Sequence, residues 1–151
     1  MQKTSRSVKH ILIELSLVYA IAFAVNFVWE MLQMPLYEGV RFNDLRSYFV
    51  CLRAAFGDAN ISLAIFMLGR FLFGNWDWSL KLTFVKACFA GLLGAGVAIG
   101  IERYALVHDR WAYSTLMPVI PRIDVGVVPV IQLMILPYLS YVISHKLSGR
   151  N

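Results

Sequence analysis

The sequence predicts an all-α, polytopic membrane protein in which four transmembrane helices form a bundle. Hydrophobic residues make up 59% of the 151 residues, above the roughly 45–50% of an ordinary soluble domain. They fall in four long blocks, each near the ~20 residues that a helix needs to cross a bilayer. We therefore expect one integral-membrane domain over residues 1–151, with spans at about 11–34, 48–71, 82–102 and 125–144.

The first span ends in an unusual polar stripe. It follows a basic segment, residues 1–10, but its apolar run is too long for a signal peptide and leads into no clean small-residue cleavage site. Asn26, Glu30 and Gln33 close the run, and their i, i+4, i+7 spacing puts them on one helical face. Inside a membrane such a face must turn toward protein or trapped water. The stripe therefore predicts a site.

The second and third spans differ in what they carry. The second contains Arg53 and Asp58, a heavy polar load for a membrane helix. The third is rich in small residues, including Gly96 and Gly100 at GxxxG spacing, which lets helix backbones approach closely in lipid. Tight packing within one chain is the favoured explanation, and a homo-oligomer through the Gly96/Gly100 face is the alternative.

The longest connection, residues 102–124, is aromatic and bounded by prolines. We expect it to lie in the membrane interface as a short segment, and a short helix capping the bundle is one form that it can take. The fourth span holds Gln132 between Pro129 and Pro137. Two prolines are expected to bend or loosen this helix and to free backbone carbonyls.

The distribution of basic residues predicts the orientation. With four spans, both termini share one side of the membrane, and every lysine falls on that side. Its basic residues are Lys3, Arg6, Lys9, Arg70, Lys81, Lys86, Lys146 and Arg150. The opposite side has five arginines diluted by acidic residues. The positive-inside rule then places both termini in the cytoplasm, and we expect a plasma membrane, such as the bacterial inner membrane.

Depth brings polar residues from separate segments into one layer. A rise of about 1.5 Å per residue places Glu30, Asp58, Glu102 and Gln132 in the outer half of the membrane. We predict Glu30 and Asp58 as catalytic residues. As substrate-binding residues we predict Asn26, Trp29, Gln33, Glu102, Arg110, Trp111, Tyr113 and Gln132.

Clustered acids in this layer need a way to avoid full ionisation, since a carboxylate at a helix centre costs about 2.5–3.5 kcal/mol on insertion scales. One solution is structural, with Arg53 or Arg110 pairing with Asp58. In the other, one acid keeps its proton and can serve as a Brønsted acid. The amides of Asn26 and Gln33 can equally serve only to tie helices together.

Several classes of function lack their usual signatures. The two cysteines, Cys51 and Cys88, sit in apolar segments without CxxC spacing, and the histidines are scattered. We therefore expect no metal site and no cofactor. The net charge of +5 comes without a basic run interleaved with aromatics, which argues against nucleic-acid binding and favours a membrane surface.

The element Asn26-Phe27-Val28-Trp29-Glu30 resembles the N-x-x-W-E element of small integral-membrane terpene cyclases, which act on meroterpenoids and indole terpenoids. The resemblance covers five residues, and this chain is shorter, with fewer spans, than the usual members. It implies that Glu30 protonates an epoxide or alkene without a metal, with Asp58 or Glu102 standing in for the family's second acid. More broadly, the chain resembles four-helix sterol isomerase and sigma-2 receptor-like proteins, whose paired membrane acids face a lipid-shaped cavity.

These observations favour an enzyme that performs acid–base chemistry, cyclisation or isomerisation, on an isoprenoid or other membrane lipid. The aromatic rings of Trp29, Trp111 and Tyr113 are expected to stabilise a developing carbocation. Two alternatives remain open at this point. One is a non-enzymatic lipid-binding protein or small carrier, and the other is a structural subunit of a membrane complex.

Overall fold

The protein is all-α, as the sequence predicts, with four helices long and apolar enough to cross a membrane among the residues described. The computed structural model describes residues 7–80 and 83–148. Its long helices are α1 (Val8–Gln33), α2 (Leu45–Phe73), α3 (Phe84–Val107) and α4 (Val127–Leu147). A 3-10 turn, η1 (Met34–Leu36), follows α1, and strands β1 (Val119–Ile120) and β2 (Val125–Gly126) precede α4.

Most of the helix ends lie a few residues outside the predicted spans, and α2 has a defined cap at each end. The side chain of Asp44 accepts a hydrogen bond from the backbone N–H of Arg46 at 3.0 Å and starts α2. Gly74 ends α2 in the left-handed conformation, with φ of 72°, and its N–H donates to the carbonyl of Arg70. Pro35 occupies the start of η1, where its missing N–H is not needed.

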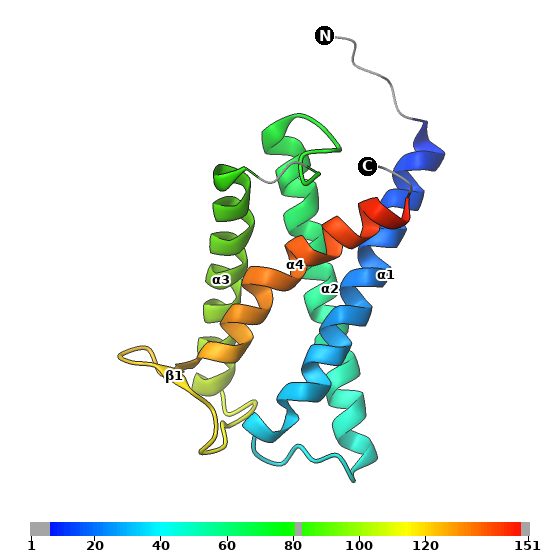
Figure 1. Cartoon of the computed structure of the whole chain (residues 1–151). Coiled ribbons are helices and arrows are strands. Elements are labelled where there is room, and N and C mark those ends of the chain that lie inside the picture. Colours follow the sequence, from blue (N-terminus) through cyan, green and yellow to red (C-terminus); the bar gives the residue numbers. More distant parts are fainter. Residues whose placement is uncertain (1–6, 81–82, 149–151) are drawn as a thin grey trace.

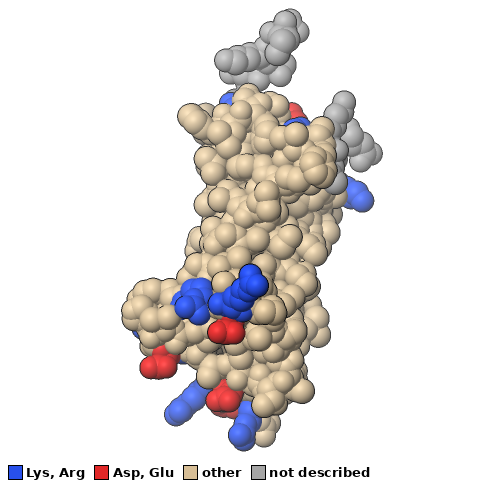
Figure 2. Space-filling view, turned by 90° about the vertical axis from the view of Figure 1, so that its left-hand side faces the viewer, with Lys and Arg blue, Asp and Glu red and all other residues tan. Residues whose placement is uncertain are grey.

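The helices are arranged as two antiparallel hairpins, α1–α2 and α3–α4, which Figure 1 shows side by side. Helix α4 crosses the other helices obliquely and contacts α1, α2 and α3, whereas α2 and α3 touch each other only over a small area. The start of α1 and the end of α4 lie at the same end of the bundle. Charged side chains gather toward the two ends of the face in Figure 2, with an uncharged zone between them.

The connection between α3 and α4 forms a β-hairpin and no capping helix. Strands β1 and β2 pair antiparallel, with Val119 opposite Gly126 and Ile120 opposite Val125. Pro121 cannot donate a helical hydrogen bond, and Arg122 and Asp124 take positive φ values of 76° and 51° that close the turn.

A second contact ties this connection to the one between α1 and α2. Tyr37 and Tyr113 form an isolated antiparallel β-bridge. On either side of it, the N–H of Glu38 donates to the carbonyl of Ala112 and the N–H of Ser114 donates to that of Leu36, each at 2.9 Å. The segments that close this end of the bundle are therefore held together by backbone hydrogen bonds.

The close approach of α3 and α4 depends on Gly94, which the GxxxG pattern did not include. A Cβ atom on Gly94 would overlap the carbonyl group of Leu133. The glycines of the pattern, Gly96 and Gly100, are exposed and have open space where a side chain would stand. They face away from the bundle, so oligomerisation through them stays a prediction.

Aromatic residues fill the core at the end where α1 begins. Trp78, Phe66 and Tyr141 are fully buried and pack ring against ring, with centroids 5.2–6.1 Å apart. The indole of Trp78 donates to the carbonyl of Phe66 at 3.0 Å and occupies the space that the missing side chain of Gly69 leaves. The polar residues that the sequence predicts as a site lie in the opposite half of the bundle.

Candidate functional site

A cavity of about 560 Å³ lies at the end of the bundle that the two connections close, opposite the aromatic core. All four helices contribute to it, together with residues around η1 and the segment after α3. Seven of the ten predicted site residues line it, namely Glu30, Gln33, Asp58, Glu102, Arg110, Trp111 and Gln132. Apolar side chains such as Val50, Ile61 and Leu133 complete its walls. The space is within the range of small-molecule sites, about 300–1,000 Å³.

A directional chain of hydrogen bonds runs from Trp29 to the cavity. The indole of Trp29 donates to Oε1 of Gln33 at 3.2 Å. Because an indole N–H can only donate, the Nε2 atom of Gln33 must point the other way, where it donates to Oε1 of Gln132 at 3.2 Å and to Oε1 of Glu30 at 2.9 Å. The orientation of the Gln132 amide is thereby fixed, with its NH₂ group turned toward the acids.

The other end of the network is fixed by Asn26. Its Nδ2 donates to the carbonyl of Ala22 at 2.8 Å, which leaves its Oδ1 to accept from Nε2 of Gln132 at 3.0 Å. Asn26 is 0% exposed and Gln132 is 2% exposed. The spacing of the stripe on α1 thus serves to hold one amide from α4.

Glu30 and Asp58 meet at that amide. Nε2 of Gln132 lies 2.9 Å from Oε1 of Glu30 and 2.8 Å from Oδ2 of Asp58, in addition to its contact with Asn26. Three acceptor oxygens therefore converge on a nitrogen that carries two hydrogens. The two carboxyl groups are joined through one shared nitrogen atom. The structure thus brings the two predicted catalytic acids, from α1 and α2, into one half-buried pair.

Glu102, at the far side of the cavity, is held by three aromatic donors. Tyr37 donates to its Oε1 at 3.3 Å, and the indole of Trp111 donates to its Oε2 at 3.1 Å. The hydroxyl of Tyr113 also donates to Oε2 and accepts from the N–H of Gly126 at 2.9 Å. Burial, together with the nearby Glu102, raises the pKa values of Tyr37 and Tyr113, which keeps both hydroxyls protonated as donors.

Neither cavity-lining arginine neutralises an acid. Arg53 and Arg110 both line the cavity, but neither forms an ion pair or a side-chain hydrogen bond with any residue of the described ranges 7–80 and 83–148. The structural alternative, in which Arg53 or Arg110 pairs with Asp58, is therefore not what this arrangement contains. The acids are held by neutral amide and aromatic donors instead.

Three of the predicted substrate-binding residues lie behind the cavity wall. Asn26, Trp29 and Tyr113 do not line it. Each holds a residue that does, because Asn26 and Trp29 orient the glutamines and Tyr113 holds Glu102. Their positions fit a positioning role, which sequence spacing alone does not separate from direct contact.

Sequence reasoning did not include Tyr37 and Gly57 in the cavity wall. Tyr37 follows Pro35 and looks like an ordinary interfacial aromatic, so no local pattern marks it. Gly57 precedes Asp58 directly, and a small residue beside an acid within a membrane span is a usable signal for a cavity. No atom lies within 4 Å of the place where a Cβ on Gly57 would stand.

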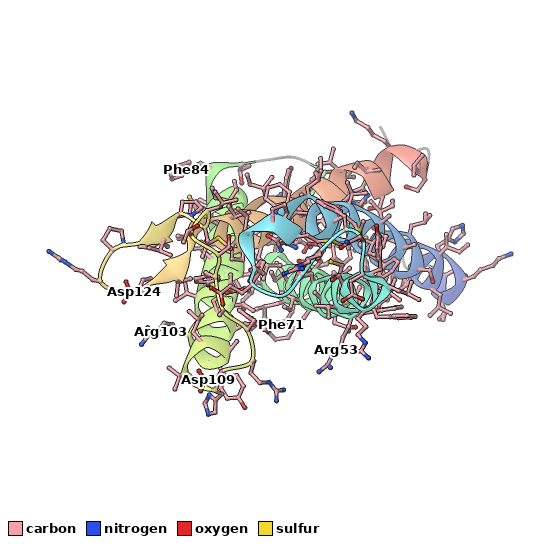
Figure 3. All side chains as sticks on the ribbon, turned by 90° about the horizontal axis from the view of Figure 1, so that it is seen from below. Arg53, Phe71, Phe84, Arg103, Asp109 and Asp124 are labelled. Carbon is pink, nitrogen blue, oxygen red and sulfur yellow. The ribbon has the colours of Figure 1, made fainter. Side chains whose placement is uncertain are left out.

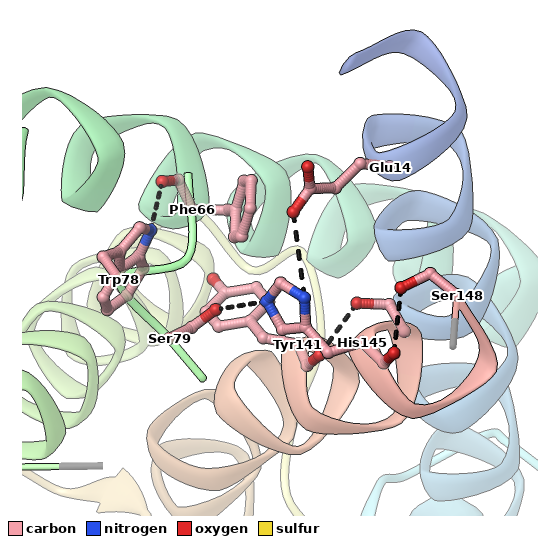
Figure 4. A network of polar contacts seen from close by, with 8 residues as sticks. Glu14, Phe66, Trp78, Ser79, Tyr141, His145 and Ser148 are labelled. Carbon is pink, nitrogen blue, oxygen red and sulfur yellow. Dashed lines mark hydrogen bonds and ion pairs between the residues drawn. The ribbon is translucent and has the colours of Figure 1, made fainter. Parts of the chain in front are cut away.

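A second polar network at the opposite end of the bundle was also not predicted (Figure 4). His145 is 2% exposed, and its Nε2 lies 2.8 Å from the hydroxyl oxygen of Ser79. Its Nδ1 lies 3.8 Å from Oε1 of Glu14, which is 3% exposed. Ligand atoms of Glu14, Asp77 and His145 lie within 4.8 Å of one another, the only such group of three potential metal ligands in the described part of the chain. The network joins α1, the α2–α3 connection and α4.

Comparisons of this chain with models of protein families, with curated proteins and with solved structures gave no match. The class of the protein is therefore described from its fold and its site alone. It is a four-helix membrane protein whose paired carboxyl groups face a partly apolar cavity.

Proposed function

We propose that the protein is a membrane enzyme that uses Glu30 and Asp58 for proton transfer on an isoprenoid or other lipid substrate. The observation that carries this proposal is the meeting of both carboxyl groups at one amide nitrogen of Gln132, at 2.9 and 2.8 Å, beside a 560 Å³ cavity. Acids in a membrane span without a basic partner are costly, and ionisable groups under such strain concentrate at functional sites.

The number of hydrogens on the Gln132 amide indicates the protonation state of Glu30 and Asp58. The amide of Gln132 has two hydrogens for three acceptors, so one of the three oxygens lacks a hydrogen from it. Two ionised carboxylates that approach the same nitrogen atom also repel each other. One proton shared by the pair supplies the missing hydrogen and removes this repulsion. The pair then holds a Brønsted acid and a base side by side, the combination that proton-transfer catalysis needs.

A complete cycle uses only these two groups. The protonated carboxyl donates its proton to an alkene carbon or an epoxide oxygen, which generates a carbocation. The cation closes a ring or shifts its charge, and it then loses a proton from a neighbouring carbon to the carboxylate. The substrate leaves as an isomer with its atoms and electrons conserved, and the pair regains its proton. The ring of Trp111 at the cavity wall can stabilise the cation through its π-face.

The protein in this proposal sits in a plasma membrane with both termini in the cytoplasm. In the described ranges, Lys9, Arg70, Lys86 and Lys146 support the assignment, while Lys3, Arg6, Lys81 and Arg150 lie outside the described residues. The acid pair then belongs to the outer half of the bilayer.

Deuterium uptake tests the proposal even while the substrate is unidentified. The purified protein is incubated in D₂O with fractionated membrane lipids, and lipids that gain deuterium are identified by mass spectrometry. We expect uptake with the wild type and loss of at least about 10²-fold with Glu30→Gln or Asp58→Asn, the usual contribution of a general acid or base. Asn60→Leu, on the exposed side of α2, is the control and should leave uptake unchanged. Equal uptake in all four proteins, or lipid binding without uptake by the wild type, would overturn the proposal.

A further inference from the structure

We propose that the substrate of this cavity is an amphiphile with a phosphate-type anionic head group, which Arg53 and Arg110 bind at the cavity mouth. The inference rests on the proposed function in taking this cavity as the substrate site. The two guanidinium groups come from different elements, α2 and the segment after α3, and both line the same space. Figure 3 shows Arg53 on the side of the bundle where α3 ends at Asp109, next to Arg110 in the chain.

Neither of these two guanidinium groups forms an ion pair or a side-chain hydrogen bond with a described residue. Arg103 donates to the carbonyl of Ile123 at 2.9 Å, and the guanidinium of Arg70 lies 5.1 Å from the centre of the Trp76 ring. Arg53 and Arg110 have no comparable partner among the described residues. Other exposed arginines also lack one, but those do not line the cavity.

The acids of the cavity have neutral hydrogen-bond donors and do not pair with these arginines. Glu30 and Asp58 receive amide hydrogens from Gln132, and Glu102 receives its hydrogen bonds from Tyr37, Trp111 and Tyr113. Two guanidinium groups at the mouth therefore remain available to a ligand. Each presents a planar fork of donors that matches phosphate oxygens, whereas a cationic head group would be repelled.

The backbone around Arg110 is held by hydrogen bonds. The backbone N–H of Arg110 donates to the carbonyl of Ala105 at 2.9 Å. The next residue, Trp111, is hydrogen-bonded to Glu102. The backbone of Arg110 is therefore already ordered, so that only the side chain loses freedom when it binds an anion.

The apolar part of the ligand reaches the acids between α2 and α3. These helices touch only over a small area, and Ala54, Gly57 and Asp58 of α2 and Ala98 and Glu102 of α3 all line the cavity. The open space at Gly57 provides room for a hydrocarbon chain. A head group at the arginines then places the chain beside the acid pair.

Binding to the full-length protein in detergent tests this inference separately from turnover. The probes are a prenyl monophosphate of three isoprene units, the matching neutral alcohol and inorganic phosphate, with short-chain phosphatidylglycerol as competitor. We expect the prenyl phosphate to bind the wild type at least about tenfold more tightly than the alcohol, the factor supplied by one charge-assisted hydrogen bond. Inorganic phosphate and phosphatidylglycerol should not displace it at equal concentration.

Matched variants locate the two parts of the ligand. The double variant Arg53→Gln/Arg110→Gln should lose the tenfold preference for the phosphate, whereas Arg46→Gln, which does not line the cavity, should keep it. Gly57→Leu should weaken the binding of both prenyl probes by filling the cavity, whereas Gly96→Leu, on an outward face with equal open space, should not.

Three outcomes would overturn the inference. They are equal binding of phosphate and alcohol, an unchanged preference in the double variant, and full displacement by inorganic phosphate or by phosphatidylglycerol. The second would mean that the arginines do not hold the phosphate, and the third would mean that the site binds free phosphate or bulk lipid without selecting the prenyl chain. Deuterium uptake lost in Glu30→Gln together with any of these results removes this inference and leaves the proposed function intact. Selective prenyl phosphate binding with uptake unaffected by Glu30→Gln removes the proposed function alone.

Discussion

Replacing Gly94 with alanine should separate α3 from α4 and disturb the acid pair at the same time. The new Cβ atom would lie 2.7 Å from the carbonyl carbon of Leu133, while ordinary contact begins at 3.4 Å. Helix α4 must therefore move by at least about 0.7 Å, since a backbone carbonyl cannot rotate away as a side chain can. Overpacking of this kind costs about 1–3 kcal/mol of unfolding free energy.

The same movement acts on the site through the neighbouring residue, Gln132. Its amide nitrogen lies 2.8–3.0 Å from its three acceptors, and a displacement of about 0.7 Å would take these contacts close to 3.5 Å, beyond good hydrogen-bond geometry. Gly94→Ala is therefore expected to weaken both the fold and the network. Gly94 thus couples helix packing to the geometry of the acids.

Gly96→Ala is the matched control, because a Cβ atom there meets nothing within 4 Å. It should leave stability unchanged or raise it by up to about 1 kcal/mol through the helix preference of alanine over glycine. Detergent-induced unfolding, followed by circular dichroism, measures both variants against the wild type. Equal stability of Gly94→Ala and Gly96→Ala would show that α3 and α4 do not need a glycine at this contact.

Three further predictions concern other contacts. Gln132→Leu should lower the unfolding free energy by about 1–3 kcal/mol for each acceptor left buried without a donor and should abolish deuterium uptake; a variant with unchanged stability would contradict the network. Because burial raises the pKa values of Tyr37 and Tyr113, their contribution to stability is complete below about pH 10, the ordinary tyrosine pKa, and is lost as the pH rises above it. Unfolding midpoints measured from about pH 9 to about pH 11 should therefore fall for the wild type and fall less for Tyr37→Phe/Tyr113→Phe, and equal slopes would count against this. Gly69→Ala would place a Cβ atom 2.9 Å or less from ring atoms of Trp78, so it should lower the thermal midpoint, and a rise would show that the indole can move.

The fold was predictable because each membrane helix corresponds to one long apolar run in the sequence. Its details depend on contacts between segments that lie far apart in the chain. The bridge between Tyr37 and Tyr113 stabilises the α3–α4 connection from outside, so the local sequence of that connection does not reveal the hairpin. The rotation of α3 about its axis decides whether Gly94 or Gly96 faces α4, and four apolar helices with weak amphipathicity do not specify it from pattern alone.

The site was partly predictable for a related reason. The i, i+4, i+7 spacing places Asn26, Glu30 and Gln33 on one face of a single helix, which the sequence alone shows. The structure puts all three into one hydrogen-bond network. The position of Trp29 was harder to interpret, because its ring suggested a contact with a cation, while its N–H donates to Gln33 one turn later. The partner of His145 could not be found by spacing, since Glu14 lies almost a whole chain away.

The position of the acid pair along the chain has a consequence for how the protein is made. Glu30 and Asp58 belong to the first helical hairpin, and Gln132 follows Asp58 by 74 residues. At a synthesis rate of about 5–20 residues per second, Asp58, the later of the two acids, precedes this amide by roughly 4–15 s. During that time each ionised carboxylate costs about 2.5–3.5 kcal/mol in the membrane. Helix α4 therefore brings the amide that both acids share, and a chain truncated before α4 would leave Asp58 without an amide donor and Glu30 with that of Gln33 alone.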